Sequence, residues 1–184
     1  MRAAGGGSPG AACQDWSVRK SFAIALILPA LALPFTGCSD GRQVATPPAC
    51  MGAAQDWVAA LAVAPDRVLI DQASPISDCL PKYQGAAQIQ EVGNTAVEAA
   101  TQLSAFLKGG SGGEAGQDTE SSAEAALMAG YLVGALENGA ADTRGIHDTL
   151  VQRVKAAATN HLGEASPKVR AQYRKGREAG LESG

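Results

Sequence analysis

Apolar side chains recur every three or four residues along much of the chain after Cys50, and this spacing places them on one face of an α-helix. The clearest stripe lies in residues 84–108 and contains Ile89, Val92, Ala96, Ala99, Leu103 and Phe106. Further helices are predicted at residues 51–63, 121–138 and 144–161, and from Pro167 onward. The last of these begins with Ser166-Pro167, a helix cap followed by proline at the first helical position.

Two segments of this part of the chain lack the helical spacing. Residues 66–81 contain two prolines and are predicted to form an irregular connection. Residues 109–118 are rich in glycine and are predicted to form a flexible loop. Ser121 and Glu124 then match a capping box at the start of the next helix. The pattern as a whole predicts an all-α fold, a small bundle of about four to five helices.

The predicted helix at 121–138 carries small residues four positions apart, at Ala126, Gly130 and Gly134. Such a row lets a second helix backbone approach closely, and in a membrane it would suggest a dimer contact. The acidic residues Glu124 and Glu137 and the short length favour a close helix pair inside a soluble bundle. The composition agrees, because 37 Ala and 22 Gly stand against only two Trp, three Tyr and three Phe.

An apolar run of about 15 residues, 21–35, lies near the N-terminus behind Arg19 and Lys20. A transmembrane helix needs about 20 apolar residues, so the run is short for a stable span. A basic segment, an apolar segment and a small-residue exit are the three parts of a secretory signal peptide. We therefore expect residues 1–37 to be a signal peptide.

The exit sequence Phe35-Thr36-Gly37-Cys38 resembles the lipobox of bacterial lipoproteins. The resemblance covers residues 18–38 and implies that the Cys38 sulfur carries a diacylglyceryl group, with cleavage just before it. The protein would then be attached to the cell membrane on its extracytoplasmic face. Residues 38–49 would be the lipidated cysteine and a flexible tether, and residues 50–184 the helical domain. The alternative is an uncleaved signal anchor that happens to end in cysteine.

The segment from Met1 to Ser17 does not suit the start of a signal peptide, because it contains three consecutive glycines, Pro9 and the acidic Asp15. A valine codon can serve as a bacterial start. Our hypothesis is that translation begins at Val18 and that residues 1–17 are a misassigned start.

Removal of residues 1–37 changes the charge and leaves few cysteines. The full chain has 15 basic and 18 acidic residues, and this segment holds three of the former and one of the latter, so the remainder has a net charge of −5. An acidic chain of this kind argues against nucleic acid as a partner. Cys50 and Cys79 remain besides Cys38, and a pair in an exported protein predicts a disulfide. Two free thiols or a metal pair are the alternatives.

The two histidines are the natural candidates for chemistry. On one helix His147 and His161 would lie about 21 Å apart, too far to share a metal ion. The sequence contains no zinc, di-iron, serine-nucleophile or phosphate-loop motif. We expect His147 to be a hydrogen-bonded residue at the edge of the core. We therefore predict no catalytic residue, metal or cofactor. The alternative is a metal-handling or enzymatic domain in which His147 works with Asp148 or Asp142.

Basic residues gather in the predicted last helix of this otherwise acidic chain. They are Lys168, Arg170, Arg174, Lys175 and Arg177. The opposite side of the helix carries Val169, Tyr173, Gly176 and Gly180. A basic amphipathic helix can contact an anionic surface and so reinforce a lipid anchor. The alternative is a solvated face whose cations offset acidic residues of the bundle.

These observations predict a membrane-anchored cell-envelope lipoprotein whose domain is a non-enzymatic binding or scaffolding module. Its partner would be an envelope protein or an anionic polymer. Segments 130–135 and 145–147 are similar to exported proteins of high-GC bacteria, with no particular activity implied. A helical subunit that is complete only within a complex is a third possibility.

Overall fold

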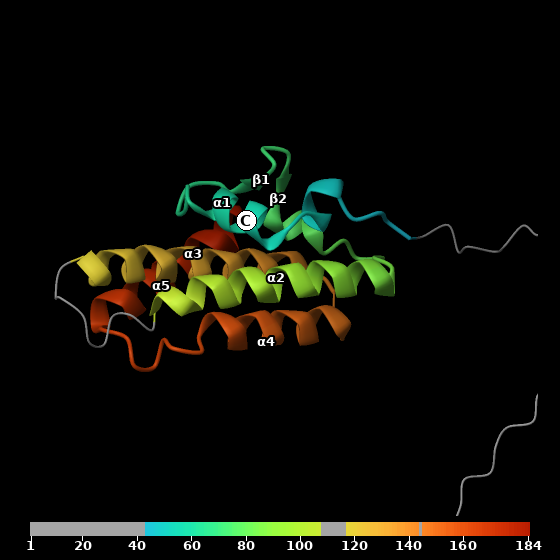
Figure 1. The fold of residues 1–184 in the computed structure, drawn as a ribbon. Coiled ribbons are helices and arrows are strands. Elements are labelled where there is room, and N and C mark those ends of the chain that lie inside the picture. The colour runs from blue at the N-terminus through green and yellow to red at the C-terminus, as the bar shows by residue number, and fades with distance from the viewer. Residues whose placement is uncertain (1–42, 108–116, 144) are drawn as a thin grey trace, which may run out of the picture. The chain divides into compact units, whose positions relative to one another are not determined.

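The central element of the fold is one long helix, α3 (Gln117–Ala140), which is buried on nearly all sides between Ser122 and Leu136. The computed structural model describes residues 43–107, 117–143 and 145–184, except for the side chains of residues 117–119. Helices α2 (Ala86–Leu107), α4 (Ile146–Ala158) and α5 (Pro167–Ser183) all pack against α3. Figure 1 shows α2 and α4 lying alongside it and α5 partly behind it. Because neighbours cover the middle of α3 all round, its sequence from Ala125 to Leu136 is apolar or small rather than striped.

A smaller group of short elements covers another side of α3 (Figure 1). In chain order it consists of η1 (Pro48–Met51), α1 (Ala54–Leu61), β1 (Leu69–Ile70), β2 (Ser74–Pro75) and η2 (Ile76–Cys79). Both α1 and η2 contact α3, and their buried side chains join the core of the bundle. The prediction of an all-α bundle with four to five helices is confirmed, since the described residues contain five α-helices.

The segment 66–81, which we expected to be irregular, contains a small hairpin. Strands β1 and β2 are antiparallel, with Leu69 opposite Pro75 and Ile70 opposite Ser74. Residues 71–73 connect the strands, and Asp71 and Gln72 have φ angles of 51° and 53°. The Ala73 backbone N–H donates to the Ile70 carbonyl at 3.1 Å and closes the turn. The sequence did not predict this turn, because no glycine occupies the turn positions. The two prolines of the segment favoured an irregular connection instead.

The helix boundaries agree closely with the hydrophobic spacing in most places. The stripe at 84–108 is α2, and Ser166 caps α5 by accepting a hydrogen bond from the Val169 backbone at 3.4 Å. The expected start of the third long helix at Ser121 is wrong, because α3 already begins at Gln117. Its first turn therefore uses the end of the polar segment that we expected to be loop. Residues 108–116 lie outside the described part of the chain.

The row of small residues in α3 faces a second such row in α5, so the expected close helix pair is present. A Cβ atom added to any of four glycines would come within 3.0 Å of the backbone of the other helix. These glycines are Gly130, Gly134, Gly176 and Gly180. The two backbones touch directly there, which small residues allow and larger ones prevent.

The order of these contacts shows that α3 and α5 run parallel. Gly176 lies against Leu127, and four residues later Gly180 lies against Tyr131. The start of α5 is therefore beside the first half of α3, and the C-terminus is near the last turns of α3. The Asn138 side chain confirms this, because its amide donates to the Gly184 carbonyl at 3.1 Å.

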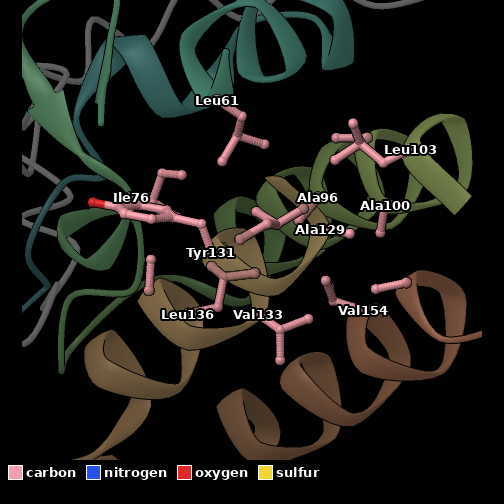
Figure 2. Packing of buried hydrophobic residues seen from close by; sticks show 14 of the residues in the cluster. Leu61, Ile76, Ala96, Ala100, Leu103, Ala129, Tyr131, Val133, Leu136 and Val154 are labelled. Atoms are coloured by element: carbon pink, nitrogen blue, oxygen red, sulfur yellow. The ribbon is translucent and has the colours of Figure 1, made fainter. Parts of the chain in front are cut away.

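Tyr131 joins α5 to the group of short elements. Its ring is fully buried and lies beside Ile76 in the core (Figure 2). The phenol oxygen accepts a hydrogen bond from the Val68 backbone at 3.1 Å. Ser183 donates to the Ala179 carbonyl, so its oxygen is free to accept the phenol proton at 3.1 Å. One hydroxyl thus connects the hairpin region, α3 and the last turn of α5.

We predict that Gly130→Ala destabilises the fold by about 1–3 kcal/mol, because the added methyl group meets the Tyr173 carbonyl and forces the two helices apart. This loss would exceed the roughly 1 kcal/mol that alanine gains over glycine within a helix. The measurement is the denaturant midpoint of the domain, followed by circular dichroism. Gly163→Ala is the matched control, since a Cβ there meets nothing within 4 Å. Equal stability of the two variants would contradict the proposed contact.

Candidate functional site

The predicted lipidation residue Cys38 and the predicted signal peptide, residues 1–37, lie outside the described residues. The same holds for residues 39–42 of the predicted tether.

The predicted disulfide between Cys50 and Cys79 is present. The two Cα atoms are 5.4 Å apart, within the usual range for a disulfide, and both side chains are fully buried. The bond connects η1 to η2 and closes a loop with a sequence separation of 29 residues. Closing a loop of this size stabilises a domain by about 3–4 kcal/mol through the entropy of the unfolded chain.

The chain joins the domain before residue 49, the predicted end of the tether. The Val44 backbone N–H donates to the Tyr83 carbonyl at 3.1 Å. Thr46 is only 5% exposed. The expected flexible segment up to residue 49 is therefore ordered from about Val44. Within the described residues the Val44 contact is the first hydrogen bond between the entering chain and the domain, and residues 39–43 lie between it and Cys38.

A buried network of polar side chains surrounds this entry point. The Gln84 amide nitrogen donates to the Thr46 hydroxyl and, at 3.0 Å, to the Cys79 carbonyl. The Gln84 amide oxygen lies 3.2 Å from His147 Nε2. His147 Nδ1 lies 2.7 Å from the Thr143 hydroxyl oxygen. The network joins the end of the tether, the disulfide and the start of α4.

The contact with Gln84 places a proton on one nitrogen of His147. Because the Gln84 nitrogen already donates to Cys79, its oxygen faces the imidazole and needs a donor there. Nε2 therefore carries a hydrogen. The Thr143 hydroxyl has one proton, and both the Ala140 carbonyl, at 3.0 Å, and Nδ1 lie within its reach. Burial lowers the pKa of His147, and the nearby Asp148 carboxylate opposes this shift. Burial therefore favours the neutral ring, and the two contacts agree with the expected role as a hydrogen-bonded residue at the core edge.

The other groups named for possible chemistry are not assembled around His147. The Asp148 carboxylate accepts from the Gly145 backbone at 3.2 Å and so caps α4. Asp142 is exposed and lines a hollow of about 530 Å³ together with Val44 and Thr143. His161 lies beyond the other end of α4, next to Asn160. Within the described residues, no group of three His, Cys, Asp or Glu side chains is placed to hold a metal ion.

The five basic residues of α5 divide into two groups. Arg177 pairs with Glu137 of α3 at 2.7 Å, and Lys155 lies 3.9 Å from the same carboxylate. Arg170 donates to the Ala165 carbonyl at 2.5 Å, where the chain turns into α5. These two arginines are therefore engaged in holding the fold together.

Lys168, Arg174 and Lys175 are exposed. In the described part of the chain, none of the three has an acidic partner within 4.0 Å. Tyr173, between them on the buried side, has its pKa raised to about 12 by burial and by the Glu137 carboxylate, against the opposing effect of Arg177. The sequence alone could not separate the paired cations from the exposed ones. The pairing of Glu137 with Arg177 forms only when α3 and α5 pack together.

Lys168 and the point of chain entry lie at different ends of the bundle. Lys168 is in the first turn of α5, which runs parallel to α3, whereas Arg174 follows Tyr173, which lies against Gly130 near the middle of α3. The entry point lies beyond the end of α3, since Val44 and Thr143 line the same hollow. A helix of 24 residues is about 36 Å long. Lys168 is therefore separated from the entry point by most of that length.

A wider groove of about 1000 Å³ lies between α1 and the hairpin, with Asp56, Arg67 and Asp71 among its lining residues. It contains none of the residues that the sequence singled out. No helix in the described ranges is both long and apolar enough to cross a membrane. Comparison with protein-family models, curated proteins and solved structures finds no match for this chain.

We predict that the domain loses stability as the pH falls below the ordinary His147 pKa of 6.5. The folded pKa is lower than the unfolded one, so the unfolded state binds the proton first and stability is complete only above 6.5. The measurement is the melting temperature between about pH 8 and about pH 5.

The His147→Gln variant should show a smaller fall in melting temperature over this range than the parent. His161→Gln, at a partly exposed position, serves as the control and should keep the parent's dependence. If His147→Gln and the parent had the same pH dependence, the burial of a neutral imidazole would be contradicted.

Proposed function

We propose that this chain is a lipoprotein of the bacterial cell envelope, anchored through a diacylglyceryl group on Cys38, and that its helical domain is a non-enzymatic binding module. The observation that carries the proposal is the arrangement at the start of the domain. Residues 39–43 link the lipobox-like cysteine to a chain segment that is hydrogen-bonded to the domain at Val44. The buried disulfide at Cys50 follows directly. A disulfide supports an oxidising location, which is where a secreted lipoprotein would reside.

The short link constrains where the domain works. Five residues extend at most about 18 Å, so the domain would stay close to the bilayer surface. The exposed Lys168 lies toward the other end of the bundle from the point of entry, and the exposed Arg174 and Lys175 lie beside the middle of α3. We propose that they face away from the anchor and contact an acidic partner, either an envelope protein or an anionic polymer.

The alternative of an enzyme or metal-handling protein using His147 has less support. The ring is 3% exposed, and both of its nitrogens lie within hydrogen-bonding distance of protein side chains, Gln84 and Thr143. A catalytic base or a ligand needs a free nitrogen that a substrate or metal can reach. The structure instead uses this side chain to hold three segments together.

We expect Cys38→Ser to abolish acylation and membrane attachment while leaving the fold intact. The measurement is metabolic labelling with a fatty acid analogue in a bacterial host, together with fractionation of membranes from the soluble envelope contents. Cys50→Ser/Cys79→Ser is the control, because it removes thiols elsewhere and should still be labelled. Labelling of the Cys38→Ser chain would contradict the proposal.

We expect Arg174→Glu/Lys175→Glu to weaken binding of the domain, residues 39–184, to an acidic polymer. The probe is immobilised dextran sulfate, and the measurement is the salt concentration that elutes the domain, because such contacts are screened by salt. Arg177 is left unchanged, since Glu137 depends on it.

The control Arg67→Glu/Arg153→Glu makes the same charge change at two other exposed positions. Elution at the same salt concentration for both double variants would show that net charge alone matters, and would contradict a specific role for α5.

A further inference from the structure

Three of the exposed large apolar side chains lie next to the buried network at the point of chain entry. Val44 is 47% exposed, Tyr83 is 48% exposed and Ile146 is 56% exposed. Each lies one or two positions before a residue of the network. Val44 precedes Thr46, Tyr83 precedes Gln84, and Ile146 precedes His147. Such side chains cost free energy when they face water, and a group of them marks a contact surface.

The network brings these three residues to one end of the molecule. The Gln84 side chain contacts both Thr46 and His147, so the segments that carry the apolar residues meet there. Figure 1 shows α2 and α4 both starting at the end where the described chain enters. Lys82 adds a cation, with its amine 5.9 Å from the centre of the Tyr83 ring. We call Val44, Lys82, Tyr83 and Ile146 the tether-exit patch.

We propose that the tether-exit patch rests in the interfacial region of the bilayer that holds Cys38. This inference rests on the lipid anchoring proposed above. The five residues between Cys38 and Val44 reach at most about 18 Å, so this end of the domain is the one held nearest the lipid. Tyrosine is favoured at the membrane interface because its ring is apolar and its hydroxyl polar. Lysine can bury its stem there while its amine stays in water.

The charges around the patch indicate which kind of lipid contact this is. Asp78 and Asp142 line the hollow next to Val44 and Lys82, and Asp148 lies two residues from Ile146. These acids would be repelled by an anionic surface, and they oppose Lys82, the one cation among the described residues of the patch. The sequence adds Arg42 and Arg144, each two residues from a patch residue, so the charges near the patch largely cancel. The contact is therefore apolar and aromatic, and it does not require anionic lipid. It also differs from the sequence-based idea of a membrane contact through the basic last helix.

The experiment uses the full chain, lipidated in a bacterial host, purified and reconstituted into phosphatidylcholine vesicles that contain brominated lipid. Bromine quenches tryptophan fluorescence only at short range. Tyr83→Trp places the probe in the patch. Phe106→Trp is the matched control, because it is also an exposed aromatic position, 58% exposed, but near the far end of α2. The distance along α2 between its first turn and Phe106 is about 30 Å. Trp57 is fully buried, so its fluorescence is the same background in both tryptophan variants.

We expect the added emission of Tyr83→Trp to be largely lost in brominated vesicles and that of Phe106→Trp to be retained. Substitution of Val44 and Ile146 by serine in the Tyr83→Trp chain should restore most of the emission. Equal retention for both tryptophan variants, with the protein still attached to vesicles, would overturn the patch and leave the anchor intact. Quenching at Phe106→Trp alone would overturn it as well. Failure of the chain to attach at all would instead refute the proposed function.

A second copy of the chain is the competing occupant of the patch. The unlipidated domain, residues 39–184, should therefore sediment as a monomer at micromolar concentration. A dimer that is lost on Tyr83→Ser would show that the patch serves self-association, and would overturn the membrane assignment.

Discussion

The direct backbone contact between α3 and α5 is the constraint on which the rest of the domain depends. Four glycines allow the two helices to touch, and the chain has few large side chains that could fill a wider gap. The contact also determines direction, because α5 must run parallel to α3 for its glycines to match. That direction brings Ser183 to Tyr131 and so connects the last turn of the chain to the hairpin region. A domain poor in aromatic residues thus obtains its packing from short distances between helices.

The second organising feature is the network of Thr46, Gln84, His147 and Thr143. Thr46, Thr143 and His147 are buried, Gln84 is half-buried, and the Gln84 side chain contacts both Thr46 and His147. Its position beside the disulfide gives the first residues of the domain two independent attachments, one covalent and one polar. A protein pulled by a membrane anchor would need its entry point held in this way, which connects the stability of the fold to the proposed function.

The two ends of the bundle differ in chemistry as a consequence of the topology. The entry point, with its exposed Val44, Tyr83 and Ile146, lies past the end of α3. Lys168 of α5 lies toward the start of α3, and Arg174 and Lys175 lie beside its middle. The parallel arrangement of α3 and α5 produces this separation, since an antiparallel α5 would have placed Lys168 next to the entry point. We infer a division of roles, with one end toward the lipid and the other toward an acidic partner.

The sequence by itself determined the features that depend on neighbouring residues. Helical spacing predicted α2, α4 and α5 because burial of one face is a local pattern. The Ser166 cap is set by residues three positions apart. Only two cysteines remain after Cys38, so the disulfide pairing had one solution. The rows of small residues predicted that a close helix contact exists.

Only the tertiary structure decided which distant groups meet. Arg177 pairs with Glu137, which lies 40 residues earlier, and Gln84 reaches His147, which is 63 residues away. No local pattern encodes such pairs, because they form only after the helices have packed in a given direction. The same holds for the entry of the chain at Val44, where a polar segment typical of a tether is ordered by the groups it meets. The physical reason is that helix formation is a short-range property of the chain, whereas the choice of partners depends on how its faces fit together.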